Sequence, residues 1–211
     1  MSFKLPVLCS LKPSSQSYTA GLPEFQWADL CDKEEIGRGT YGTVLLANNQ
    51  TTSEKVVVKK LIVSSRLDDK QRFFKEARLL HNIRHKNVVE FKRVCVEPAA
   101  IMLEYVYFDF LPFCPDDSPR VHSLEEFLSH LDATDAVASF PSCLQLKIAE
   151  DVAKGLEHLH QSGIYHRDLK TSNVLVSNTH YSHIEDQEAL VQAFNNEIII
   201  CKLTDFADFD N

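Results

Sequence analysis

Three stretches of the chain carry residues whose types and spacing suit phosphate chemistry. The first runs over residues 36–44, where Gly37, Gly39 and Gly42 precede Val44. Glycines let a backbone approach a phosphate chain closely and present N–H groups to it. A Rossmann turn uses the same glycine spacing, but that turn opens a helix, whereas β-branched residues follow here. A plain glycine hairpin remains the alternative for this stretch alone.

The second stretch is Val56-Val57-Val58-Lys59, about one strand further along. A lysine at the end of a buried strand is costly to desolvate unless its ammonium meets an anion. We therefore expect Lys59 to contact phosphate, with Glu76 on the following helix bracing the ammonium. An exposed lysine and an exposed helical glutamate are the alternative. Lys60 should point to the opposite face of the strand.

The third stretch, residues 165–175, reads Tyr-His-Arg-Asp-Leu-Lys-Thr-Ser-Asn-Val-Leu and follows a long amphipathic segment. Further along, the β-branched run 198–203 leads to Asp205. Asp168, Asn173 and Asp205 offer oxygen ligands and a base, which magnesium-dependent phosphoryl transfer requires. The order of these strings behind the glycine loop predicts one phosphoryl-transfer site.

The elements that must position these residues change in character along the chain. Before residue 106 the sequence alternates short β-branched runs with one helical stretch, in which Phe73, Ala77, Leu80 and Arg84 share a face. The candidate strands are residues 44–46, 55–63, 88–96 and 100–106. This pattern predicts a small, mainly antiparallel sheet with one helix.

After residue 106 the pattern becomes helical. Residues 123–126 and 142–145 both fit a capping box, and the second would open a long helix that Gly163 ends in a left-handed cap. The apolar stripe of this helix is Leu144, Ile148, Val152, Leu156 and Leu159. Two segments read as insertions. Residues 107–122 suggest an ordered loop or a docking surface, and residues 177–197 hold about two helical turns between 185 and 194.

Over roughly residues 29–211 these strings resemble the protein kinase superfamily. The resemblance implies an α+β, two-lobed protein kinase-like fold with a small antiparallel β N-lobe plus one helix, and an incomplete helical C-lobe. It divides the chain into a flexible leader (1–28), the N-lobe and hinge (29–106), and a partial C-lobe (107–211). The last of these ends after the Asp-Phe-Ala motif.

The resemblance also implies a role for each matched position, with ATP and Mg²⁺ as cofactors. Asp168 would accept the proton of the substrate hydroxyl, and Lys170 would stabilise the transferring phosphate. Asn173 and Asp205 would hold the metal, and Leu103 would be the gatekeeper. The nucleotide-binding residues would be Gly37, Gly39, Gly42, Val44, Lys59, Glu76, Glu104 and Val106.

The implied function is transfer of the ATP γ-phosphate to Ser or Thr of a protein substrate. Lys170, two residues after Asp168, favours this group over true tyrosine kinases. The chain would be a truncated fragment or isoform of such a kinase. The alternative is a non-catalytic kinase-like module that binds nucleotide or a partner. Without further C-lobe helices the 144–159 stripe would lack cover, which predicts an unstable chain that needs a chaperone or docking partner.

Three positions depart from the family pattern. Ala207 replaces the glycine after Asp-Phe, and because alanine resists positive φ we expect restricted flipping of this loop. Val57 replaces a small residue and should tighten the roof of the adenine pocket. The inserted segment 177–197 lengthens the path from Asp168 to Asp205, which surface loops tolerate.

Composition limits the remaining classes of function. The chain is 44% hydrophobic and 25% charged, as soluble globular proteins are, and its formal net charge of −8 argues against nucleic acid as the main partner. No segment has the ~20 apolar residues of a membrane span, and the first residues lack a signal-peptide core. The six cysteines form no C-x-x-C pair. We expect free thiols in a cytoplasmic protein.

Overall fold

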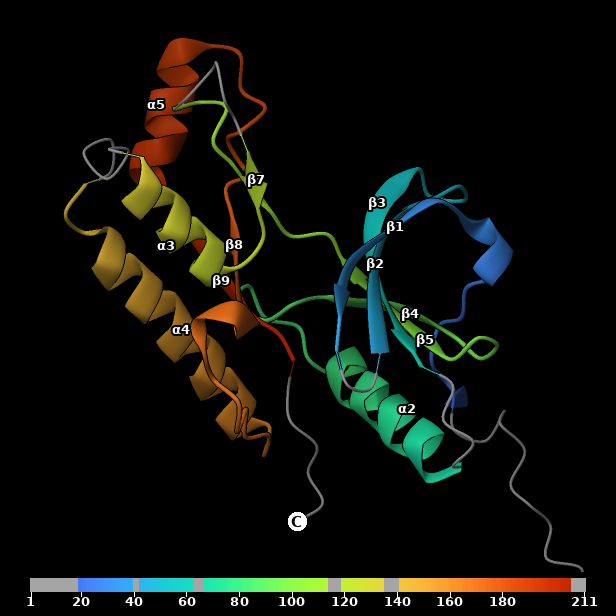
Figure 1. The fold of residues 1–211 in the computed structure, drawn as a ribbon. Helices are drawn as coiled ribbons and strands as arrows, with labels where there is room; N and C mark the ends of the chain where they lie inside the picture. Colours follow the sequence, from blue (N-terminus) through green and yellow to red (C-terminus); the bar gives the residue numbers. More distant parts are fainter. Residues whose placement is uncertain (1–18, 40–41, 63–66, 114–118, 135–140, 206–211) are drawn as a thin grey trace, which may run out of the picture.

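The computed structural model describes residues 19–39, 42–62, 67–113, 119–134 and 141–205, which form a sheet lobe and a helical lobe (Figure 1). The sheet lobe holds an antiparallel sheet of five strands in the order β1-β2-β3-β5-β4. These strands are β1 (Leu30–Arg38), β2 (Gly42–Asn49), β3 (Glu54–Leu61), β4 (Phe91–Cys95) and β5 (Ala100–Glu104). The predicted α+β fold with an antiparallel sheet is confirmed.

Two details of the sheet lobe differ from the prediction. Strand β1 did not stand out in the sequence, because its residues 32–36 are exposed and mostly charged. Helix α2 (Leu67–His81) buries Phe73, Ala77 and Leu80 as predicted. However, Arg84 lies beyond the helix end and is exposed. The chain leaves the helix at this point and buries Ile83 instead.

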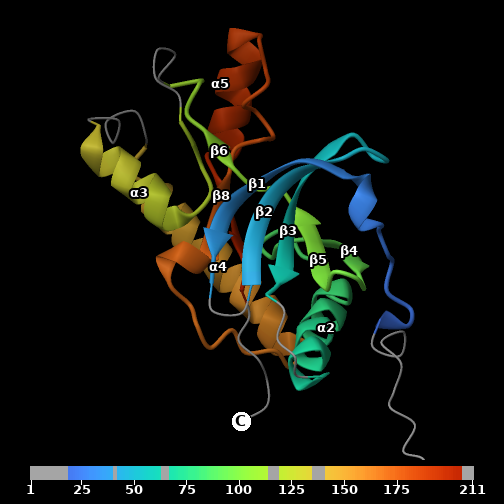
Figure 2. The same ribbon diagram turned by 45° about the vertical axis from the view of Figure 1, so that its right-hand side comes forward.

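The outer face of the sheet is covered by the residues just before β1. Phe25 and Leu30 are buried with Val56 and Val58, and Trp27 packs at the edge of this second core. The backbone pairs with β4, since Phe25 N–H donates to Val94 O and Val94 N–H donates to Pro23 O, both at 2.9 Å. The expectation of a flexible leader up to residue 28 is therefore wrong for residues 19–28, which pack on the sheet (Figure 2).

The helical lobe combines helices with a short strand pair. Its elements are α3 (Leu124–Ala133), α4 (Leu144–Gln161), β8 (Val174–Ser177), α5 (Gln187–Asn196) and β9 (Ile200–Leu203). Ser123 accepts from Glu126 N–H in the predicted capping box. The box predicted at residues 142–145 is wrong. The residue before α4 is Cys143, whose backbone is already helical and whose side chain makes no cap. Gly163 follows α4 with φ +75°, the predicted left-handed conformation.

Helix α4 buries a narrower apolar stripe than predicted. Leu144 and Leu159 are buried, whereas the three stripe residues between them are only partly buried. Gly155 lets α4 lie close to β9, since an added Cβ there would lie 2.9 Å from the Leu203 side chain and 2.7 Å from Asn87 O. A line of buried residues through Asp151 and Gly155 thus seats α4 against β9.

The two predicted insertions pack against each other. Asp109 N–H donates to Asn178 Oδ1, and Asn178 Nδ2 donates back to Asp109 O, each at 2.8 Å. Phe108 and Phe110 are fully buried, so these aromatics of the hinge-side segment form core rather than an exposed docking patch. This segment contributes β6 (Phe108–Asp109) and β7 (Arg120–Val121). Helix α5 (Gln187–Asn196) ends two residues beyond the helical turns predicted between 185 and 194.

We predict that Phe25→Ala lowers the free energy of unfolding by about 3 kcal/mol, because truncating a buried phenylalanine removes its packing and leaves a cavity. Urea unfolding measures this change. Leu146→Ala is the matched control, since Leu146 is 72% exposed. Equal effects of the two substitutions would show that residues 19–28 do not pack on the sheet in solution.

Candidate active site

The side chain of Lys59 joins elements from both lobes. Strand β3 carries it on the face toward α2, where its Nζ lies 2.9 Å from Glu76 Oε1 and 3.3 Å from Asp205 Oδ1. Burial opposes the charge, but the carboxylates of Glu76 and Asp205 outweigh burial and raise the pKa of Lys59 above its usual value. Lys60 points to the other face, over the Trp27 ring, as its position in the strand predicts.

The glycine stretch forms the hairpin between β1 and β2. Gly39 N–H donates to Gly42 O at 2.8 Å, and Val44 pairs directly with Lys59 on the neighbouring strand. Gly42 is required by space, since a Cβ there would lie 2.8 Å from Lys60 O. At Gly37 and Gly39 an added Cβ would meet nothing closer than 3.7 Å. The chain continues from strand to strand, which excludes the Rossmann reading.

Asp168 is the centre of the second group of polar side chains. Lys170 Nζ lies 2.9 Å from Asp168 Oδ2, and Asn173 Nδ2 donates to Asp168 O and Oδ2 at 2.8 and 3.0 Å. The hydrogen bond from Lys170, helped by the one from Asn173, lowers the pKa of this exposed carboxyl group. The short 3₁₀ helix η3 (Thr171–Asn173) turns Asn173 back toward Asp168.

Asp205 is brought beside this loop by β9. Strand β9 pairs with β8 through Val174 and Leu203, and Thr204 N–H donates to Asn173 O at 3.1 Å. Asp205 itself has φ +56°, a left-handed conformation that costs a non-glycine residue about 1–3 kcal/mol. This turn directs its carboxylate to Lys59. The expectation for Ala207 falls outside the described residues.

The donor atoms near Asp205 fit a hard divalent cation. Because the amide nitrogen of Asn173 donates to Asp168, its amide oxygen is the atom that could ligate a metal. Mg²⁺ is usually held by one or two protein oxygens together with substrate phosphates. Within residues 19–205, as far as the structure describes them, no group of three His, Cys, Asp or Glu side chains forms a metal site.

Two residues of the predicted hinge, Glu104 and Val106, form hydrogen bonds within the protein. The Glu104 carboxylate accepts Lys202 Nζ at 2.6 Å and Glu90 N–H at 2.8 Å, and the Glu104 backbone N–H donates to Glu90 O at 3.0 Å. Val106 O lies 3.2 Å from His122 Nδ1. Leu103, the predicted gatekeeper, is buried and pairs with Val57 of β3.

The structure thus brings the predicted residues into one connected set and adds two that sequence reasoning missed. Lys202 could have been noticed as a lysine inside an otherwise β-branched run. His122 gave no local signal, because its contact with Val106 depends on how the hinge-side insertion folds back.

In the described part of the chain no helix is long and apolar enough to cross a membrane.

Similarity to known proteins agrees with this geometry. The chain is 32% identical to calcium/calmodulin-regulated receptor-like kinase 1 of Arabidopsis thaliana over 83% of its length, which is 38% of that protein. It is 29% identical to CTD kinase subunit alpha of Schizosaccharomyces pombe over 79% of its length and 25% of the relative. It is also 29% identical to cyclin-dependent kinase 9-B of Xenopus laevis, over 73% of its length and 41% of the relative.

The chain therefore spans less than half the length of each of these curated relatives. A family model described as the protein kinase domain matches residues 30–207, which include both lobes and every residue of the connected set. By this match and by its fold, the chain belongs to the protein kinase family.

Proposed function

We propose that the protein is a kinase that transfers the γ-phosphate of ATP to Ser or Thr of a protein substrate, with Mg²⁺ as the metal. The observation that carries the proposal is the placement of the Lys59 ammonium between Glu76 and Asp205, from two different lobes. A charged lysine fixed in this way is ready to bind the α- and β-phosphates of ATP. Such positioning and charge stabilisation account for most of the catalysis in phosphoryl transfer.

Each remaining residue has a role in this proposal. The hairpin with Gly37, Gly39 and Gly42 covers the phosphates, and Val44 packs beside the nucleotide. The backbones of Glu104 and Val106 read the adenine. When bound through Asn173 and Asp205, Mg²⁺ neutralises charge on the phosphates.

Asp168 is the proposed base for the substrate hydroxyl, and Lys170 is the proposed cation for the transferring phosphate. Their direct contact supports both roles, because the lysine keeps the carboxylate ionised while remaining within reach of the acceptor. The choice of Ser or Thr as acceptor rests on the position of Lys170 two residues after Asp168. A cytoplasmic location is supported by the free thiols of Cys31, Cys95, Cys143 and Cys201. The expected chaperone or docking partner stays a prediction.

We expect Asp168→Asn to lower the rate of phosphate transfer roughly 10²- to 10⁴-fold, because a general base contributes about that much. Affinity for Mg·ATP should change less than threefold, since Asp168 faces the acceptor rather than the nucleotide. Asp132→Asn, on the exposed side of α3, is the matched control and should leave both quantities unchanged. If wild-type protein transfers no phosphate yet binds Mg·ATP, the non-catalytic alternative holds.

The acceptor is tested with peptide pools that offer only Ser, only Thr or only Tyr. We expect transfer to the Ser and Thr pools, with transfer to Tyr at least roughly tenfold slower. The hydroxyl oxygen of Ser or Thr lies closer to the peptide backbone than that of Tyr, so a site that places the first beside the Asp168 carboxylate misplaces the second. Phosphorylation is measured by mass spectrometry. Transfer to the Tyr pool at the same rate would refute the Ser/Thr assignment.

The pH dependence follows from the lowered pKa of Asp168. A carboxyl group with a lowered pKa stays ionised to a pH below its usual value of about 3.9, so Asp168 should cause no fall in kcat/KM between pH 8 and pH 5. Lys170→Met removes the main cause of the lowered Asp168 pKa, and the acid limb of the pH profile of kcat/KM should then move to higher pH. An unmoved limb in this variant, with folding checked by circular dichroism, would contradict this account.

A further inference from the structure

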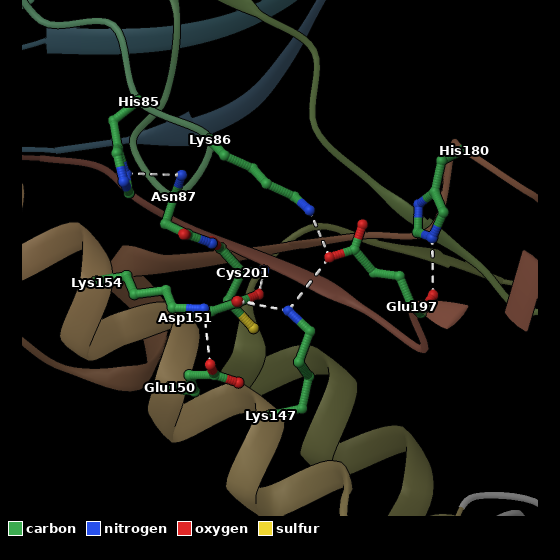
Figure 3. A network of polar contacts seen from close by, with 10 residues as sticks. All are labelled: His85, Lys86, Asn87, Lys147, Glu150, Asp151, Lys154, His180, Glu197 and Cys201. Carbon is green, nitrogen blue, oxygen red and sulfur yellow. Dashed lines mark hydrogen bonds and ion pairs between the residues drawn. The ribbon is translucent and has the colours of Figure 1, made fainter. Parts of the chain in front are cut away.

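We propose that Glu197, at the end of the inserted segment 177–197, is a positioning residue that fixes the loop after α2 and thereby the Lys59–Glu76 pair. This inference rests on the proposed kinase function and adds a regulatory role for the insertion. Figure 3 shows the contacts that carry it, which join the insertion, the loop after α2 and helix α4.

The insertion itself holds Glu197 in place. Glu197 follows the last turn of α5, where its N–H donates to Ala193 O at 3.0 Å. From the other side of the insertion, the ring of His180 donates from Nε2 to Glu197 O at 2.7 Å. The buried Tyr181 hydroxyl donates to Ile198 O at the same distance. The backbone around Glu197 is thus fixed by residues 17 positions earlier in the chain.

The Glu197 carboxylate contacts two lysines from different elements. Oε1 lies 2.5 Å from Lys86 Nζ in the loop after α2 and 3.4 Å from Lys147 Nζ on α4. Lys147 is also paired with the buried Asp151 at 2.5 Å, whose other oxygen accepts Cys201 N–H. Because Lys147 keeps Asp151 as a partner, loss of the Glu197 charge would chiefly release Lys86.

From Lys86 the connection to the active site is short. The next residue, Asn87, accepts Leu203 N–H at its carbonyl and donates from Nδ2 to Cys201 O, both at 2.9 Å. Val89 N–H donates to Leu203 O at 2.9 Å. The loop therefore forms an isolated parallel bridge to β9 at Val88 and Leu203, just before Asp205, and the Asn87 carbonyl lies against Gly155 of α4.

The same loop thus links the two elements that hold Lys59. Its start leads out of α2, which carries Glu76, and its end pairs with β9, which leads to Asp205. A shift of the loop would change the position of Glu76 relative to Asp205. Because elements with two packed arrangements respond to small shifts, the Lys86–Glu197 contact can bias the fraction of molecules in which Lys59 is correctly placed.

The test compares variants of Lys86 and Glu197 in the whole protein, with kcat/KM for ATP measured well below each melting temperature. Lys86 is 53% exposed, so a single neutralisation has a modest effect, and we expect Glu197→Gln to lower kcat/KM roughly two- to fivefold. Lys86→Glu places a second carboxylate against Glu197 and should lower it roughly tenfold. Lys86→Arg keeps the charge and should match the wild type.

The decisive comparison is the double variant Lys86→Glu with Glu197→Gln. If the two residues act through each other, this variant should recover at least threefold relative to Lys86→Glu alone, although it carries one more substitution. Hydrogen exchange at α2 should slow again in parallel. A purely structural role predicts a double variant that is less active than either single one, and that result would overturn the inference.

Glu150→Gln is the matched control. Glu150 pairs with Lys154 on the exposed side of α4, so this substitution should not affect activity. An equal loss in this control and in Glu197→Gln would also overturn the inference. Wild-type activity that is abolished by Asp168→Asn establishes the kinase function separately. Failure of the positioning role is then distinguishable from failure of the proposed function.

Discussion

The placement of one ammonium group between two carboxylates is the constraint on which the rest of the structure depends. Lys59 comes from the sheet, Glu76 from α2 and Asp205 from the end of β9, so the three can meet only if both lobes are correctly arranged. A partly buried charge without partners would be strongly destabilising, which makes this contact a sensitive reporter of lobe geometry. The packing of α2 on the sheet, the strand pairing of β8 with β9 and the loop between α2 and β4 all serve to bring these atoms together.

The candidate site residues could be named from the sequence because they occur in short motifs of characteristic residue type and spacing. Glycine spacing, a lysine ending a valine run, and a string with Asp168, Lys170 and Asn173 each need only local order to be recognised. The strands were predicted where β-branched residues repeat, and α2 where apolar residues share a face. Strand β1 was missed because a charged, exposed strand has no apolar alternation to reveal it.

Features that depend on contacts distant in sequence could not be predicted. Residues 19–28 read as a leader because proline and serine dominate the segment before them, yet Phe25 is buried on the outer face of the sheet. The cap expected at Ser142 was replaced by a helical Cys143, since backbone geometry rather than residue type decides whether a side chain can cap. The two insertions look unrelated in sequence, and Asp109 meets Asn178 only across 69 residues. Glu197 resembles any surface glutamate until its two lysines are seen.

The central claim is that Lys59 lies at the phosphates of bound ATP, and an acyl-phosphate derivative of ATP tests it most directly. Such a reagent acylates the amine nearest to the phosphate chain, and peptide mass spectrometry then identifies the modified lysine. The account predicts that Lys59 is modified first and that Mg·ATP in excess protects it. Lys92, which lies on β4 away from this site, should react slowly and without protection. Modification spread over surface lysines, with no protection of Lys59, would contradict the account.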